Sequence, residues 1–227
     1  MFENKIIIID NFYPDPDLVR EFALKQSFSK ATNEQGMAIP GVRTESVSDI
    51  DDDMFRLLKR SVFQPIFGIP KYHISLEESI LTNYQLNVEE DGDSWVHGDA
   101  VEDTGINLSG VIFLTPNAPK NSGTIFYELN PEHQEEAAKY FEEHSSFRGI
   151  NRKENVELYE KFFRVKQVVD NVYNRAVIYS GVTLHKSDYY FGQNAENGRL
   201  IQPFFGSVRD IKYEFVDDQQ FRIDDNV

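Results

Sequence analysis

A succession of short apolar runs, separated by turn residues, constrains the fold of this 227-residue chain most strongly. From residue 74 onward the runs are rich in Ile, Val, Phe and Tyr, the residues that strands prefer. We expect strands at 80–88, 108–114, 123–127, 166–169, 176–179, 182–185, 200–205 and 212–216, after an N-terminal strand at 6–9. Because no strand–helix–strand alternation accompanies them, we predict an α+β, mainly β fold: an antiparallel sandwich or jelly roll.

Helices are expected on the N-terminal side of this β region and once within it. Asp15 is a suitable N-cap for a helix that has Pro16 in its first turn. A second helix should begin near residues 51–53 and end before Pro65. A helical insertion is predicted at about 130–165, with its second helix opening at Asn151. The N-terminal helices would cover one outer face of the sheet.

The length of the chain suits a single domain. We expect an N-terminal strand and helices in residues 1–75, a β core with the helical insertion in 76–216, and an acidic tail in 217–227. Internal repeats, low-complexity segments and linkers long enough to divide the chain are absent from the sequence.

Composition excludes several classes of function. The 23 Lys and Arg against 38 Asp and Glu give a net charge of −15, which argues against nucleic acid or an anionic membrane as a partner. The absence of cysteine excludes disulfides, thiolate zinc sites and a cysteine nucleophile. The apolar run Ile6–Ile9 is too short for a signal or membrane segment, so we expect a cytoplasmic protein. Sequence motifs for phosphate loops, serine hydrolases and zinc proteases are absent.

The pair His97 and Asp99 is the first candidate for chemistry. On a strand, residues two positions apart point to the same face, so this imidazole and carboxylate would lie side by side. Two histidines and a carboxylate make the facial triad that holds non-haem Fe(II) with open positions. The alternative interpretation is a strand end whose polar residues contact water.

A candidate for the third ligand is His185, which follows an apolar strand. It lies 88 residues after His97, so only a non-local pairing of the kind found in a jelly roll lets the two share a metal. The alternative is a core histidine with satisfied hydrogen bonds, and Asp188 is either an orienting partner or another ligand. We expect His73, His133 and His144 to be surface groups.

Arg199 opens the otherwise apolar run 199–205. A guanidinium there stays charged and requires an anion, and its planar fork matches a carboxylate. The anion would come from a ligand or, alternatively, from an internal salt bridge. Arg43, within the turn segment 40–44, is expected at the surface or behind a site.

These residues together resemble the Fe(II)- and 2-oxoglutarate-dependent oxygenases, over about residues 80–208. The resemblance implies a double-stranded β-helix, iron ligands at His97, Asp99 and His185, and Arg199 as the anchor for the distal carboxylate of 2-oxoglutarate. The spacing of 14 residues between His185 and Arg199 is longer than is typical of the family. Tyr84 matches a position that often contacts the co-substrate.

The N-terminal segments 10–16, 19–24 and 40–44 resemble a narrower, largely uncharacterised family of bacterial and phage proteins. This second resemblance does not indicate a substrate.

The broader resemblance implies a hydroxylase that uses iron, 2-oxoglutarate and O2 on an unidentified substrate. A carboxylate at Asp99 implies hydroxylation rather than halogenation, because halogenating relatives have a small residue there. Two rivals stay open: a jelly-roll binding or structural module, and a metal-dependent cupin-like enzyme without 2-oxoglutarate. The insertion at 130–165 and the loop at 29–48 are candidate lids.

Overall fold

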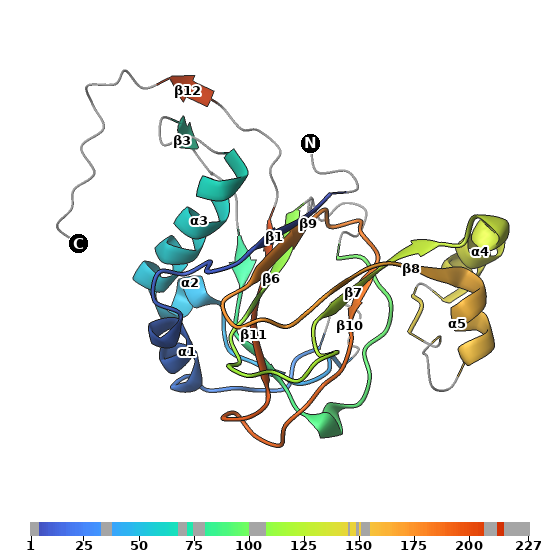
Figure 1. Cartoon of the computed structure of the whole chain (residues 1–227), viewed down its shortest axis with the longest axis horizontal. Helices are drawn as coiled ribbons and strands as arrows, with labels where there is room; N and C mark the ends of the chain where they lie inside the picture. The colour runs from blue at the N-terminus through green and yellow to red at the C-terminus, as the bar shows by residue number, and fades with distance from the viewer. Residues whose placement is uncertain are drawn as a thin grey trace.

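The computed structural model describes residues 5–32, 38–67, 72–74, 80–99, 108–144, 146–148, 150, 155–206 and 213–215. The fold is α+β and mainly β, a jelly roll in which two antiparallel sheets face each other, as predicted. Helices α1–α3 lie on the outer side of the larger sheet, and α4 and α5 lie at the opposite side of the molecule (Figure 1). No helix in the described ranges is both long and apolar enough to cross a membrane.

The larger sheet joins strands from all parts of the chain. Its order is β1 (Ile6–Ile9), β9 (Ala176–Tyr179), β6 (Leu108–Phe113), β11 (Arg199–Gly206), β5 (Gln85–Asn87) and β2 (Val42–Arg43), and β4 (Leu81–Thr82) also pairs with β11. The smaller sheet has the order β10 (His185–Ser187), β7 (Thr124–Leu129) and β8 (Phe163–Val169). A separate pair consists of β12 (Tyr213–Phe215) and β3 (Tyr72–Ile74).

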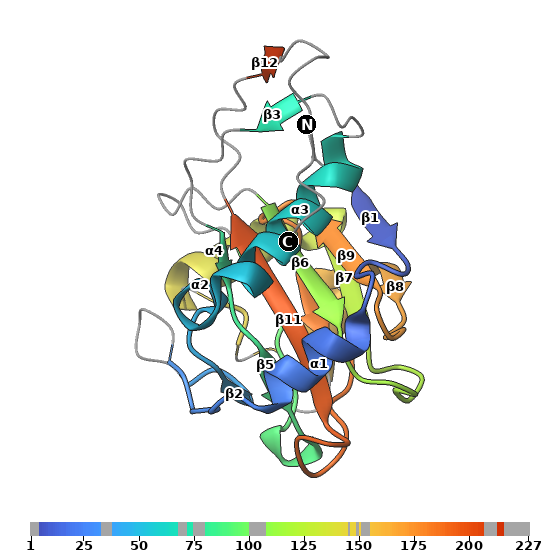
Figure 2. The same cartoon turned by 90° about the vertical axis from the view of Figure 1, so that its left-hand side faces the viewer.

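Three N-terminal helices, α1 (Pro16–Leu24), α2 (Val47–Ile50) and α3 (Asp52–Phe67), cover the larger sheet, and α1 and α3 lie in front of its strands in Figure 2. Asp15 caps α1, since its carboxylate accepts a hydrogen bond from the Leu18 N–H at 3.0 Å. The expected end of the second helix before Pro65 is wrong, because α3 continues to Phe67. A proline removes one helical hydrogen bond, which weakens a helix without always ending it.

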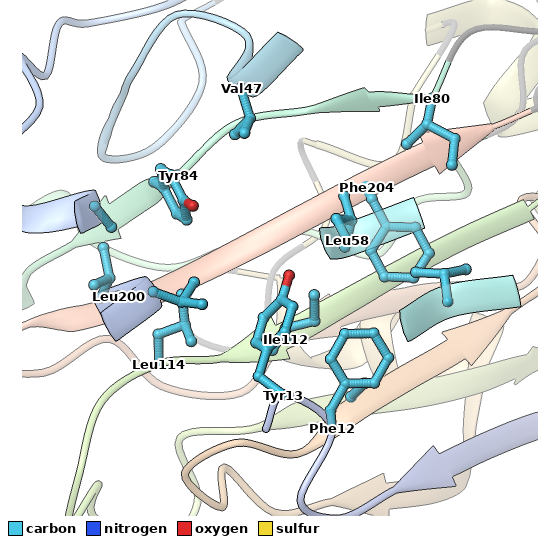
Figure 3. Packing of buried hydrophobic residues seen from close by; sticks show 14 of the residues in the cluster. Phe12, Tyr13, Val47, Leu58, Ile80, Tyr84, Ile112, Leu114, Leu200 and Phe204 are labelled. Atoms are coloured by element: carbon cyan, nitrogen blue, oxygen red, sulfur yellow. The ribbon is translucent and has the colours of Figure 1, made fainter. Parts of the chain in front are cut away.

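Two apolar layers lie on the two faces of the larger sheet. The outer layer packs the helices against the sheet through Phe12, Tyr13, Leu58, Ile112, Leu200 and Phe204, among others (Figure 3). The inner layer lies between the two sheets and consists of Val111, Phe113, Phe126, Val169, Val177, Tyr179 and Ile201. Alternation along each strand assigns neighbouring residues to opposite layers. This inner layer borders the candidate site.

The connection between β7 and β8 carries the predicted helical insertion. It comprises the 3₁₀ helix η2 (Pro131–His133), α4 (Gln134–His144) and α5 (Val156–Phe162). A third apolar layer packs these helices against the smaller sheet through Ile125, Tyr127, Ala137, Phe147, Tyr159 and Phe162. The helix α5 begins after Asn155, whereas the predicted opening at 151–154 lies outside the described residues.

Several strand boundaries differ from the prediction. The expected strand at 80–88 is divided into β4 and β5, and the acidic turn after it forms the 3₁₀ helix η1 (Glu89–Asp91). The expected strand at 182–185 begins only at His185, because a turn precedes it in which the Thr183 N–H donates to the Ser180 carbonyl. The acidic tail at 217–227 lies outside the described residues.

Candidate metal centre

His97 and His185, distant in sequence, are paired directly through their backbones. The His97 N–H donates to the His185 carbonyl at 3.0 Å, and the His185 N–H donates to the His97 carbonyl at 2.9 Å. His97 therefore lies in an isolated antiparallel bridge, outside the named strands. The Asp99 N–H donates to the Gly181 carbonyl at 2.8 Å. This bond places Asp99 beside the turn that precedes β10.

The three side chains converge on one point. Each offers one ligand atom, and these atoms lie within 4.8 Å of one another. The His97 Nε2 is 3.7 Å from one carboxylate oxygen of Asp99, and the His185 Nε2 is 3.6 Å from the other. Two bonds of about 2.1 Å at a right angle separate two ligand atoms by about 3 Å, so a metal requires only a small contraction. Among the described residues this is the cluster with metal-ligand geometry, and Asp188 is not part of it.

The Nδ1 atoms of both imidazoles are hydrogen-bonded to backbone carbonyls. The His97 Nδ1 lies 2.9 Å from the Trp95 carbonyl, and the His185 Nδ1 lies 2.9 Å from the Thr183 carbonyl. A carbonyl only accepts, so each Nδ1 carries a proton, and in the neutral ring the lone pair is on Nε2. Such a hydrogen bond orients a histidine for a metal.

Electrostatics keep His97 in the state that a metal requires. Burial, together with the neighbouring imidazole of His185, lowers the pKa of His97 to about 4, so this ring is neutral near pH 7. The Asp99 Oδ2 is buried and has no hydrogen-bond partner among the described residues. An unpaired buried carboxylate oxygen is costly, and a cation would satisfy it.

Tyr179 adds a hydroxyl group that sequence reasoning missed. It lies 3.0 Å from the His185 Nε2, to which it donates. Burial and the negative charge of Asp99 raise the pKa of Tyr179 well above its ordinary value, so the phenol stays protonated. The residue stands at the end of β9, and only the pairing of β9 in the sheet places it beside the triad.

Arg199 is buried at the start of β11, with an exposed fraction of 1%. Its Nε donates to the Ser122 carbonyl at 3.0 Å and its Nη2 to the Gly123 carbonyl at 3.2 Å. Its Nη1 is buried and has no partner, and within the described ranges its guanidinium makes no ion pair. Burial lowers the pKa of Arg199, and the charge of Asp188 opposes that effect. The internal salt bridge considered as an alternative is therefore not formed with a described carboxylate.

The structure does not bring Tyr84 to this site. Its ring lies in the outer layer, 6.1 Å from the ring of Phe22, on the face of the sheet that the helices cover (Figure 3). Alternation along β5 instead turns the neighbouring Gln85 and Asn87 to the inner face. Tyr84, which we expected to contact the co-substrate, thus lies on the opposite face of the sheet from the inner layer, because a shift of one residue exchanges the two faces of a strand.

The remaining histidines lie elsewhere. His133 contacts Glu136 at 3.1 Å, and His144 contacts the Tyr140 carbonyl at 2.9 Å, both within the helical insertion. The side chain of His73 is outside the described part of the chain. A cavity of about 400 Å³ is lined by Pro40, Asp93, Trp95 and Arg148, among others, and the Trp95 ring lies 5.8 Å from that of His97.

A family model shows where the chain belongs. Residues 2–205 match the model of a family of unknown function, DUF6445. The chain belongs to this family. A search of curated proteins finds no match. The match spans the N-terminal segments that resembled a narrower family as well as all residues of the metal centre.

Solved structures of iron- and 2-oxoglutarate-dependent oxygenases share the fold of this DUF6445 member. HygX from Streptomyces hygroscopicus with iron bound is 10% identical, with a TM-score of 0.54 over 93% of this chain and 92% of HygX. HygX with nickel and 2-oxoglutarate bound is 11% identical, with a TM-score of 0.54 over 96% and 94%. A prolyl hydroxylase from Trichoplax adhaerens, in complex with a hypoxia inducible factor peptide fragment, is 12% identical, with a TM-score of 0.52 over 90% and 84%. At these identities the likeness concerns the fold.

Proposed function

We propose that this DUF6445 protein is a non-haem Fe(II)- and 2-oxoglutarate-dependent dioxygenase that hydroxylates an unidentified substrate, with release of succinate and CO2. One observation carries the proposal: the ligand atoms of His97, Asp99 and His185 lie within 4.8 Å of one another, in a fold shared with such oxygenases. The rival interpretations, a binding module and a cupin-like enzyme without 2-oxoglutarate, do not require a buried arginine with an unpaired N–H near the triad.

The residues present fit an iron ion. Two imidazoles that present their Nε2 atoms and one carboxylate oxygen without a hydrogen-bond partner among the described residues form a facial set of three ligands. His97, His185 and Asp99 would hold the metal and leave its other positions open. The backbone bridge between the two histidines keeps the imidazoles in place before a metal binds.

The residues also fit 2-oxoglutarate. The Arg199 Nη1 is a buried donor without a partner, and the two carbonyls that hold its Nε and Nη2 prevent the guanidinium from turning away. Arg199 would bind the distal carboxylate, and the rings of Phe113 and Tyr190 would exclude water around it, since their centroids lie 5.7 Å and 5.9 Å from its guanidinium carbon.

Iron, 2-oxoglutarate and O2, when bound, supply the oxidising power to hydroxylate an unactivated C–H bond. The protein orients these groups and keeps the site dry. Tyr179 contributes a protonated hydroxyl beside Asp99 and His185. A carboxylate at position 99 occupies the place that a halide takes in halogenating relatives, which favours hydroxylation.

Titration of 2-oxoglutarate into the anaerobic Fe(II)-loaded protein tests this proposal. We expect a metal-to-ligand absorption band that saturates, and iron-dependent succinate release after O2 is admitted. Arg199→Ala should weaken 2-oxoglutarate binding by about one to two orders of magnitude, since a charge-assisted hydrogen bond contributes roughly 1.5–3 kcal/mol. Iron binding should be unchanged, because Arg199 is not a ligand.

Two further variants control this measurement. Arg199→Lys should recover part of the affinity, because it keeps the charge and loses the planar fork. Arg56→Ala removes an exposed arginine on α3 that pairs with Asp52, and it should leave the band unchanged. A wild-type protein that binds iron without ever developing the band would refute 2-oxoglutarate as the co-substrate.

A further inference from the structure

A second arginine faces the same side of the larger sheet as Arg199. In the pairing of β2 with β5, Arg43 lies opposite Gln85, and in the pairing of β5 with β11, Gln85 lies opposite Ile201 and Asn87 opposite Arg199. Opposed residues of an antiparallel pair point to the same face. Ile201 belongs to the inner layer, so Arg43 and Asn87 also face the interior that holds the metal centre.

Neither Arg43 nor Asn87 has all of its donors satisfied. The Nε of Arg43 and the Nδ2 of Asn87 are buried without a hydrogen-bond partner, and among the described residues the Arg43 guanidinium makes no ion pair. Leaving a charged donor buried and unpaired is costly. Such a donor on a half-buried guanidinium is a candidate to bind an anion.

Arg43 lies on the metal side of this interior. Burial lowers its pKa, and the nearby Tyr190 and Asp99 oppose that effect. The charge of Arg43 is in turn one of the causes that lower the pKa of His97. A ligand bound by Arg43 would therefore lie close to the metal centre, where a substrate must lie to react.

The amide of Asn87 is placed next to the strand that carries Arg43. A side chain at Gly41 would have its Cβ 2.4 Å from the Asn87 Nδ2, so only glycine leaves room for the amide there. The Oδ1 of Asn87 accepts from the Gln85 Nε2 at 3.0 Å, which turns the Nδ2 donors away from Gln85. Asn87 and Arg43 thus form two donors at one edge of the sheet.

Arg43 and Arg199 stand on different strands of the same sheet face. One strand lies between β2 and β11, and the two arginines are offset by two residues along it, so their Cα atoms are about 12 Å apart at standard strand spacings. The guanidinium of Arg199 also donates hydrogen bonds to the Ser122 and Gly123 carbonyls, on the side of the smaller sheet. With the Arg199 guanidinium held there, the unpaired Nε–H of Arg43 is available for a second anion.

We propose that Arg43, with the Asn87 amide beside it, binds a carboxylate carried by the primary substrate. The planar guanidinium suits a carboxylate, and a single negative charge suits a site beside Asp99 in a chain of net charge −15 better than a dianion does. The identity of the bound molecule as a substrate rests on the proposed function, whereas the anion site at Arg43 does not.

The test titrates acetate, with acetamide as the uncharged control, into Zn(II)-loaded protein saturated with 2-oxoglutarate at constant ionic strength. Nitrogen-15 NMR follows the Arg43 Nε–H, assigned by its disappearance in Arg43→Lys. We expect a saturable shift with acetate, at a millimolar dissociation constant, and none with acetamide. Equal responses to the two compounds, or a shift that stays linear with concentration, would overturn the proposal.

Thermal melting under the same conditions locates the binding. Acetate should raise the melting temperature of the wild type, and Arg43→Gln should weaken this acetate affinity at least about tenfold. Arg56→Gln, on the exposed side of α3, should behave as the wild type. Unchanged acetate affinity in Arg43→Gln would place the anion elsewhere and overturn the proposal.

Failure of the proposed function has a different signature. If 2-oxoglutarate does not bind the Zn(II)-loaded protein, the acetate titration on the same protein without 2-oxoglutarate still reports on Arg43. A saturable Arg43 shift there supports the anion site while the dioxygenase proposal fails. Normal 2-oxoglutarate binding with no acetate response overturns the subsite alone.

Discussion

Asp99 is the residue whose substitution we expect to affect iron binding much more than stability. Its side chain is 9% exposed, its Oδ2 has no hydrogen-bond partner among the described residues, and its structural tie is the backbone bond to Gly181. Asp99→Ala keeps that backbone bond and removes an unpaired buried oxygen. We expect iron affinity to fall by at least about tenfold and the free energy of unfolding of the metal-free protein to change by less than about 1 kcal/mol.

Iron titration and urea denaturation of the same Asp99→Ala protein measure the two effects. Glu142→Ala, an exposed residue on α4 that also loses one negative charge, is the matched control and should leave both quantities unchanged. An Asp99→Ala protein that binds iron normally would contradict the assignment of Asp99 as a ligand.

At the scale of elements, the contact between β6 and β11 depends on Gly110. A Cβ at this position would lie 2.1 Å from the Cζ of Phe204, in the middle of the outer layer. Gly110→Ala should lower the free energy of unfolding by about 1–3 kcal/mol, because a close-packed layer must shift to accept the methyl group. Urea denaturation measures the change.

The strand β11 offers a matched control at Gly206, where an added Cβ would meet its nearest neighbour, Ile80, at an ordinary 3.5 Å. Gly206→Ala should change stability by less than about 0.5 kcal/mol. Adding Phe204→Leu to Gly110→Ala should recover part of the loss, because the two residues share one contact. Equal stabilities of the two alanine variants would contradict this account of the layer.

The attachment of β1 to the sheet includes an ion pair at its end. The Arg175 Nε and Nη2 donate to the two carboxylate oxygens of Asp10 at 2.6 Å and 3.0 Å. This hydrogen bonding lowers the pKa of Asp10, so the pair stabilises the folded chain above the unfolded pKa of about 3.9, and the contribution is lost as the pH falls through the lower folded pKa. The carboxylate is 54% exposed, and solvent limits the contribution to at most about 1 kcal/mol.

Asp10→Asn tests the ion pair. The wild type should melt at a higher temperature than the variant at pH 7, and the difference should shrink as the pH is lowered below about 4. A difference that is constant over this range would mean that the carboxylate charge is not involved.

At the scale of the whole molecule, the net charge of −15 opposes folding by self-repulsion. Raising sodium chloride from about 10 mM to about 150 mM shortens the screening length from about 30 Å to about 8 Å. We expect the melting temperature of the metal-free protein to rise over this range. Replacing Glu142 and Glu143 by lysine changes the net charge from −15 to −11 and should reduce the rise. A fall in melting temperature with salt would show that local ion pairs outweigh the repulsion.

The residue types of the candidate metal centre could be predicted because they carry their chemistry in the sequence. His97 and Asp99 are separated by one residue, and His185 follows an apolar stretch. Most strands could also be predicted, since runs of β-branched and aromatic residues bounded by turn residues are typical of strands. The end of α3, the division of the strand at 80–88 and the start of β10 were less predictable, because packing and turns outside each segment decide where an element stops.

Tyr84, Tyr179 and Arg43 show what the sequence by itself left open. The chain by itself determined a mainly β fold, an acidic surface and a set of residues suited to a metal and an anion. Only the tertiary structure decided that Tyr84 faces the helices, that Tyr179 lies beside His185, and that Arg43 shares an interior face with Arg199. The physical reason is register: in a strand one residue of shift exchanges the two faces, and register is set by pairing with strands far away in the sequence.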